Sequence, residues 1–236
     1  MDHRFYDLNV GFSENWEEII NRTKTLELAG ICLVVSSKCN LKDYLTKIEE
    51  VKRNSNLEIV TGILIEEGVD KITKLAKKHR KSFELVLVRG GEYEINRAAC
   101  SSRYVDILSE PGKGRGDCGI DHICCKEAKE NKIAIELNFR ELLVAQGMEK
   151  IRELNKMKEI IRLCRKVGTH FIVNSGAQEK YELRGGRELS SLSYCLGASL
   201  EEAIEANSGY PEQLIKRNRE KMSQPLEGVS LEDYER

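Results

Sequence analysis

The chain has 236 residues, of which 33% are charged and 40% hydrophobic, with only three prolines. This composition excludes low-complexity disorder and collagen-like repetition, and its length fits one large domain or two small ones. The 38 basic and 39 acidic side chains leave a formal charge of −1, which argues against a uniformly basic coat that binds nucleic acid. A local basic patch is still compatible with this balance, because charge can be segregated between faces.

The start of the chain and its cysteines indicate a compartment. The opening Met-Asp-His-Arg lacks the apolar run of a signal peptide, and no stretch approaches the roughly 20 apolar residues of a membrane span. We therefore expect a cytoplasmic protein whose eight cysteines are thiols. Since none forms a C-x-x-C pair, we expect structural roles for them rather than metal ligation.

Seven short apolar runs alternate with amphipathic stretches along the chain. The runs are rich in Ile and Val and often apolar at consecutive positions, as in strands covered on both faces. Between them, apolar residues recur at helical spacing, beginning with Trp16, Ile19 and Ile20. Ser13 is a candidate N-cap of that first helix, and Gly30 a candidate stop. The predicted strands are 5–10, 31–36, 58–65, 83–88, 104–108, 132–137 and 170–175.

Repeated βα units predict a parallel barrel or a doubly wound sheet. The barrel is favoured because no G-x-G-x-x-G follows the first strand. After residue 175 the pattern is helical, at 188–196, 200–206 and 212–221, and no eighth strand is evident. The sequence thus predicts an α/β fold, an incomplete TIM-like (β/α) barrel with about seven parallel strands. It would form one domain over residues 1–221, followed by an acidic, flexible tail at 222–236.

Glycine stands beside arginine in the loops that follow the predicted strands. These loops meet at one end of a parallel barrel, where function normally lies. Examples are Arg89-Gly90-Gly91, the Pro-Gly-Lys-Gly-Arg-Gly-Asp segment at 111–117, and Arg184-Gly185-Gly186-Arg187. Glycine lets the backbone approach an anion, and guanidinium groups offer bidentate hydrogen bonds to phosphate. A cationic rim that binds phosphate therefore competes with a plainer interpretation as turns and solvated charges.

Side chains for protein-based catalysis are scarce at this end of the barrel. Asp7, Glu136 and Asp121 are candidate carboxylates, but of four histidines only His122 is expected on the rim. One histidine is too few for a dinuclear metal cluster, and a cap, a hydrogen-bonding partner or a phosphate contact is the more usual role. No G-x-S-x-G elbow and no Walker lysine motif occurs. We assign no catalytic residue and no metal ligand.

Several blocks of the sequence resemble ribonuclease P protein component 3, the archaeal counterpart of the smaller, barrel-like subunit of eukaryotic ribonuclease P. The resemblance covers residues 4–220, and its central block keeps strand, loop and helix features in order. The blocks are YDLNV at 6–10, YVDIL at 104–108, GIDH at 119–122, IAIELNFRELL at 133–143, SGA at 175–177 and LRG at 183–185.

This resemblance implies a barrel related to the polymerase-and-histidinol-phosphatase superfamily, whose metal-dependent phosphoesterases begin with H-x-H on the first strand. Here Asp7-Leu8-Asn9 stands in that place, so the first two ligands are missing. The resemblance implies that an RNA component removes the 5′ leader of precursor tRNA. We expect magnesium at that RNA and no cofactor on this chain. The implied partners are the other ribonuclease P proteins, especially a small ferredoxin-like subunit.

The leading hypothesis is a ribonuclease P subunit that neutralises phosphates of the catalytic RNA and meets precursor tRNA through the complex, with no membrane contact. The alternatives are a metal-dependent phosphoesterase or other phosphometabolite enzyme on the same barrel, and an adaptor whose rim packs on another protein. The candidate RNA- or phosphate-binding residues are Arg89, Arg97, Lys113, Arg115, His122, Arg140, Arg184 and Arg187, with Asn9, Asn138 and Asn174 as candidate contacts to sugar or phosphate from the strand ends.

Overall fold

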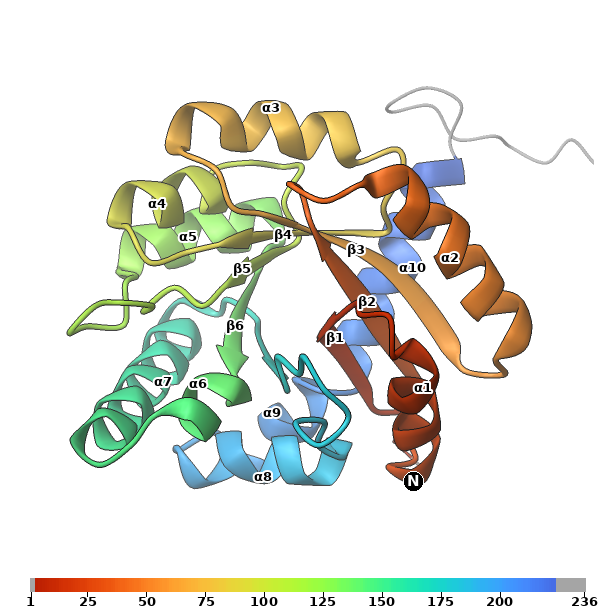
Figure 1. Ribbon diagram of the computed structural model, residues 1–236. Helices are drawn as coiled ribbons and strands as arrows, with labels where there is room; N and C mark the ends of the chain where they lie inside the picture. The colour runs from red at the N-terminus through yellow and green to blue at the C-terminus, as the bar shows by residue number, and fades with distance from the viewer. Residues whose placement is uncertain (1–2, 224–236) are drawn as a thin grey trace, which may run out of the picture.

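A computed structural model describes residues 3–223, and over this range seven parallel strands form one sheet whose order follows the chain (Figure 1). Helices surround the curled sheet, so the predicted incomplete TIM-like barrel is confirmed. Most predicted strands agree to within two residues, and the fifth begins three residues later than predicted. The strands are β1 Tyr6–Gly11, β2 Gly30–Ser36, β3 Glu58–Ile65, β4 Leu85–Arg89, β5 Ile107–Ser109, β6 Ala134–Asn138 and β7 Phe171–Asn174.

Amphipathic helices cover the outside of the barrel. None of the helices in the described part of the chain is long and apolar enough to cross a membrane. The predicted domain boundary at 221 falls inside the last helix, which includes the first two residues of the tail predicted at 222–236. The rest of that tail, 224–236, lies outside the described residues. The helices are α1 Trp16–Thr25, α2 Leu41–Asn54, α3 Val69–His79, α4 Tyr93–Cys100, α5 His122–Asn131, α6 Phe139–Val144, α7 Met148–Val167, α8 Gly186–Cys195, α9 Leu200–Glu205 and α10 Gly209–Ser223.

Alternate residues of each strand face two separate apolar cores. In β2, Cys32 and Val34 point into the barrel, whereas Ile31 and Leu33 pack under the outer helices. This explains the apolar runs without alternation, because both faces of each strand are buried. Leu214 and Ile215 of α10 join the inner core.

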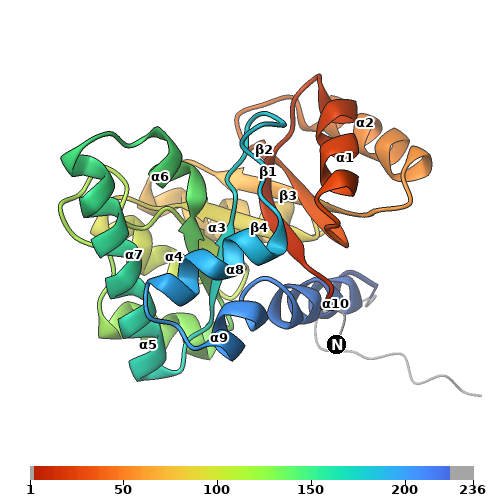
Figure 2. The ribbon, with the colours of Figure 1, turned by 90° about the horizontal axis from the view of Figure 1, so that it is seen from below.

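Helix α10 closes the amino-terminal end of the barrel, and Figure 2 shows it next to the start of β1. The side-chain amide of buried Asn218 donates hydrogen bonds to the Glu84 carbonyl oxygen at 2.9 Å and to the Asp106 carboxylate at 2.8 Å. Arg219 Nε donates to the Glu84 carboxylate at 2.6 Å. These polar contacts fix the helix over the strand starts.

Side chains bridge the seam between β1 and β7, where a complete barrel would have another strand. Leu8 N donates to Asn174 Oδ1 at 2.8 Å, and Ser175 N donates to the Asp7 carboxylate at 3.2 Å. Tyr6 N donates to the Asn207 carbonyl oxygen at 2.8 Å, while the Asn207 amide donates to β7. Buried backbone groups at a sheet edge need such partners, so the seam is closed without a strand ladder.

The boundaries predicted for the first helix are wrong. Its N-cap position is Asn15, not Ser13, and the helix ends at Thr25. Gly30 is instead the first residue of β2. Glycine is needed there because a Cβ atom would lie 2.6 Å from the Glu58 carbonyl oxygen.

Candidate functional site

The loops after the strands carry most of the predicted cations to the carboxyl-terminal end of the barrel, hereafter the rim. Arg89 ends β4, and the loop between β5 and α5 carries Lys113 and Arg115. Arg140 is the second residue of α6, the short helix after β6. The guanidinium of Arg184 lies 4.9 Å from the Phe139 ring centroid, which places it beside the end of β6.

Carboxylates on neighbouring loops pair with the cations nearest the strand ends. Arg89 forms ion pairs with Glu66 and, at 3.4 Å, with Glu110. Lys113 also binds Glu110, and its Nζ atom lies 3.5 Å from Glu141. Burial and the charge of Glu110 raise the pKa of Glu141. The rim centre is therefore a mixed network of charges rather than a cationic surface.

Arg115 and Arg140 are paired as well. Arg115 makes a bidentate contact with Asp117, at 2.6 and 2.8 Å. This contact lowers the pKa of Asp117. Arg140 Nε donates to Glu182 at 3.0 Å, on the loop that follows β7. Each cation thus has an internal carboxylate that a phosphate would have to replace.

Arg97 belongs to a cluster on the outer side of α4 and α5. Its guanidinium donates to the Tyr93 hydroxyl at 3.2 Å, and that hydroxyl donates to Asp121 at 2.5 Å. Glu127 lies 3.7 Å from Arg97. Burial alone would raise the pKa of Asp121, but hydrogen bonds from Tyr93 and from backbone N–H groups hold it at about 2.

Asp121 is also the N-cap of α5, a role that was not predicted from the sequence. Its Oδ1 atom accepts from Ile123 N at 3.0 Å and from Cys124 N at 2.8 Å. The cap fixes the first turn of the helix, where His122 is exposed. A side chain at this position adds a ring N–H to the positive end of the helix dipole, a favourable place for an anion.

Arg184 and Arg187 are three residues apart in sequence but lie at different ends of the barrel. Arg184 donates to the carbonyl oxygens of Tyr181 and Leu183, and no carboxylate in the described part of the chain pairs with it. Arg187 lines a pocket with Phe5 and residues 25–27, which precede β1 and β2. The expected rim position of Arg187 is therefore wrong.

Gly186 explains the displacement of Arg187. A Cβ atom on Gly186 would lie 2.1–2.5 Å from Phe5, and one on Gly185 would lie 3.7 Å from the Leu26 carbonyl oxygen. Gly186 thus allows α8 to pack on the residue before β1, whereas the space beside Gly185 would accept a side chain.

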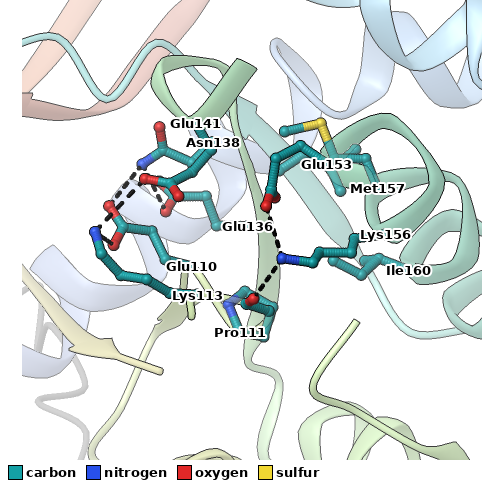
Figure 3. Close-up of a pocket in the computed structure, with 12 residues that line it drawn as sticks. Glu110, Pro111, Lys113, Glu136, Asn138, Glu141, Glu153, Lys156, Met157 and Ile160 are labelled. Carbon is teal, nitrogen blue, oxygen red and sulfur yellow. Dashed lines mark hydrogen bonds and ion pairs between the residues drawn. The ribbon is translucent and has the colours of Figure 1, made fainter. Parts of the chain in front are cut away.

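A buried lysine holds the glycine-rich loop of the rim against α7. Figure 3 shows Lys156 on one side of a small cavity of about 20 Å³, with Glu110, Glu136 and Glu141 on the other side. Lys156 Nζ donates to the Gly112 carbonyl oxygen at 2.9 Å and to Glu153 at 2.6 Å. The loop is thereby fixed before any ligand binds, and nothing in the helical pattern around Lys156 predicted this role.

The three predicted asparagines lie inside the barrel and converge on one buried carboxylate. Asn9 and Asn174 donate to Glu136 Oε1 at 2.9 and 2.7 Å, and Asn138 donates to Oε2 at 3.4 Å. The Ser109 hydroxyl donates to Oε2 as well. Because these amides are buried and committed to Glu136, the structure does not place them for contact with sugar or phosphate.

The same interior does not fit the metal centre that the superfamily resemblance implies. Four side-chain donors point at Glu136, and Asp7 accepts from the backbone N–H groups of Asn9 and Ser175. A metal ligand needs free lone pairs directed at the ion, and here protons occupy them. Within residues 3–223, no group of three or more His, Cys, Asp or Glu side chains is arranged to hold a metal ion.

Sequence reasoning missed the acidic partners on the rim, although a usable pattern was present. Glu66 and Glu110 directly follow β3 and β5, just as the predicted arginines follow other strands. Applying the strand-end rule to both signs of charge would have found them.

Known proteins resemble the chain over nearly its whole length. A family model described as RNase P subunit p30 matches residues 4–223. Ribonuclease P protein component 3 of Methanosarcina barkeri is 32% identical over 234 residues, covering 97% of this chain and 95% of the relative. The Methanothermobacter thermautotrophicus protein of the same name is 32% identical over 193 residues, with 81% and 79% covered. A chain in a cryo-EM structure of archaeal ribonuclease P with mature tRNA matches with a TM-score of 0.85 and 26% identity, covering 97% and 98%.

Proposed function

The chain belongs to the RNase P subunit p30 family, and from this membership we propose that it binds the catalytic RNA of ribonuclease P and supports removal of the 5′ leader from precursor tRNA. The observation that carries the proposal is the match over residues 4–223, which includes the whole described barrel. The fold match to a chain of archaeal ribonuclease P, at a TM-score of 0.85, supports the same assignment.

We propose that the rim is one RNA contact and that it works by exchange of ion-pair partners. Arg115 is 29% exposed and its partner Asp117 is 63% exposed, so an RNA phosphate can reach the guanidinium. Phosphate offers the same bidentate geometry as carboxylate. Arg184 and His122 have no carboxylate to displace among the described residues, and they would bind phosphate without exchange.

We propose that the partners are ribonuclease P RNA, precursor tRNA through the complex, and the other ribonuclease P proteins, including the small ferredoxin-like subunit. An apolar surface at the junction of α6 and α7 supports contact with a protein, since Met148 is 64% exposed and Ile151 is 52% exposed. A cytoplasmic location is part of this proposal. All eight cysteines are free thiols, six of them buried, as suits a reducing compartment.

We propose further that catalysis belongs to the RNA component and its magnesium, while this chain provides neither a catalytic residue nor a metal site. The saturated hydrogen bonding of Glu136 supports this division. It argues against the alternative of a metal-dependent phosphoesterase on the same barrel, which would need those carboxylate oxygens for metal ions.

Reconstitution tests the proposal. Cleavage of precursor tRNA is measured with the purified chain alone, with the RNA component alone, and with the RNA and all protein subunits with or without this chain. We expect no cleavage by the chain alone and a slower reaction when it is omitted from the complex. Elemental analysis after dialysis should find less than one equivalent of zinc, manganese or iron. RNA-free, magnesium-dependent leader cleavage by the chain would contradict the subunit assignment.

A further inference from the structure

A second cationic site lies at the amino-terminal end of the barrel, opposite the rim. A pocket of about 400 Å³ opens where α5, α7 and α10 meet, and we call it the basic pocket. Its charged and aromatic lining consists of Lys129, Lys132, His170, Tyr210 and Arg217. No carboxylate belongs to the described lining, which distinguishes this pocket from the rim.

The hydrogen-bond partners of Lys129 and Arg217 in the basic pocket are neutral, and Arg217 also forms a longer ion pair with Asp106. Lys129 Nζ donates to the Val167 carbonyl oxygen at 2.9 Å, at the end of α7. Both terminal nitrogens of Arg217 donate to the Lys132 carbonyl oxygen at 3.2 Å. Carbonyl oxygens at helix ends carry partial charge, about half a unit for a whole helix terminus. These carbonyl contacts do not cancel the formal positive charges of the pocket. Lys129 in addition caps the end of α7.

The nearest buried carboxylate is committed elsewhere. Asp106 binds Arg80 and accepts from Asn218 at 2.8 Å and from Val86 N at 2.8 Å, whereas its distance to Arg217 is 3.6 Å. Burial and the nearby charge of Arg217 lower the pKa of Lys221, one turn further along α10. Both observations indicate that positive charge is in excess around the pocket.

A pair of stacked rings lies beside these cations. The His170 and Tyr210 centroids are 3.9 Å apart with an angle of 15° between the planes. His170 is exposed, and Tyr210 is buried beneath it. Flat rings next to lysine and arginine are the combination with which proteins hold nucleotides, the rings against a base or sugar and the cations on phosphates.

We propose that the basic pocket binds backbone phosphates of RNA, as a second contact on the end of the barrel opposite the rim. This inference rests on the proposed function, because it takes RNA as the partner. The two ends are separated by strands of up to eight residues, so the sites lie roughly 15 to 25 Å apart at about 3.3 Å per residue. One phosphate cannot reach both sites, and the barrel would therefore connect two segments of folded RNA.

The test removes two exposed lysines that have no carboxylate partner. The variant Lys129→Gln/Lys132→Gln is compared with wild type for binding to transcribed ribonuclease P RNA over a series of KCl concentrations. We expect the slope of log affinity against log salt to become shallower by roughly 1.5 to 2 units, at about 0.7 to 0.9 per phosphate. The matched control is Lys42→Gln/Lys47→Gln on exposed positions of α2, with an unchanged slope.

Restoring the charge provides a second control. Lys129→Arg/Lys132→Arg should keep the wild-type slope, because the phosphate contact needs positive charge rather than lysine itself. Thermal unfolding of each variant separates binding from capping of α7. A lower Tm with an unchanged salt slope would mean that Lys129 only caps the helix, which would overturn the proposal.

The remaining outcomes separate this inference from the proposed function. If the wild type binds no RNA, the proposed function fails. If the wild type binds and a rim variant changes the slope while the pocket variant does not, only the basic pocket is refuted. An equal loss in the α2 control would also refute it. So would an unchanged RNA slope together with loss of an acidic protein subunit from the reconstituted complex, which would assign the pocket to a protein.

Discussion

The two ends of the barrel carry similar basic side chains, but these side chains have different partners at each end. On the rim, Arg89 and Arg140 each contact a carboxylate from a neighbouring loop, and Arg115 contacts Asp117 of its own loop. In the basic pocket, Lys129 and Arg217 contact only carbonyl oxygens at hydrogen-bonding distance. The rim is built from loops, which supply both signs of charge, whereas the pocket is built where helices end and basic residues complement the dipole.

This difference teaches that the position of excess charge cannot be inferred from the number of basic residues. A phosphate that reaches the rim must displace a carboxylate, so binding there is an exchange with a small net gain. A phosphate that enters the basic pocket replaces water and part of a contact with a neutral carbonyl. We therefore expect each cation of the pocket to contribute more to RNA affinity than each carboxylate-paired cation of the rim.

The largest expected effect is on the pH dependence of stability, and it concerns Asp7 in the seam between β1 and β7. Burial raises its pKa to about 7, against hydrogen bonds from Ser175 and Asn9 that lower it. The folded state thus holds a proton that the unfolded state releases near pH 4. The contribution of Asp7 to stability falls as pH rises from about 4 to about 7, by on the order of 4 kcal/mol. Denaturant unfolding at several pH values should show this fall in wild type and not in Asp7→Asn. Parallel profiles for the two proteins would contradict the prediction.

The next largest effect is on the free energy of unfolding, and it concerns the contacts that fix α10 at the amino-terminal end of the barrel. Replacing Asn218 with Ala removes one donor to the Glu84 carbonyl oxygen and one donor to the Asp106 carboxylate, while Arg80 still donates to both. We expect the free energy of unfolding to fall by about 1 to 3 kcal/mol. Lys216→Ala, an exposed change on the same helix, should stay within about 0.5 kcal/mol. If both variants unfold at the same denaturant concentration, α10 does not lock this end of the barrel.

The third effect tests the rim together with the neighbouring Arg97 cluster. Replacing Arg97, Arg115 and Arg184 with Ala should make the salt slope of RNA binding shallower by roughly 2 to 3 units, for structured RNAs of any sequence. Lys77→Ala/Lys78→Ala on α3 is the control. Arg80, late in the same segment, is unsuitable because its guanidinium is bound to Asp106. A change below about one unit would mean that the ion pairs on the rim stay closed in the complex.

The smallest effect tests whether an RNA phosphate replaces Asp117 as the ion-pair partner of Arg115. Asp117→Asn keeps an oxygen to accept from Gly119 N but removes the negative charge beside Arg115. RNA affinity should rise about threefold, since an exposed ion pair contributes about 0.2 to 1 kcal/mol. Filter binding at fixed salt is sufficient to detect this change. A weaker affinity would indicate that Asp117 orients Arg115 for RNA rather than competing with it.

Local patterns in the sequence determined the architecture. Apolar runs separated by helical periodicity predicted the seven-stranded barrel, because a strand buried on both faces must be apolar at consecutive positions. The sequence did not predict Asp121 as the cap of α5, although an N-cap acts within a few residues of its own position. The GIDH and IELN blocks indicated the family without a structure.

Only the tertiary structure decided where positive charge is not balanced by a neighbouring carboxylate. The pairs Arg89–Glu66 and Arg140–Glu182 join residues far apart in sequence, so composition could not reveal them. Arg187 lies away from the rim because the preceding residue, Gly186, packs on Phe5, which is far from it in sequence. Ion pairs depend on separations of a few ångströms between side chains. The sequence specifies which side chains carry charge, and folding specifies which of them meet.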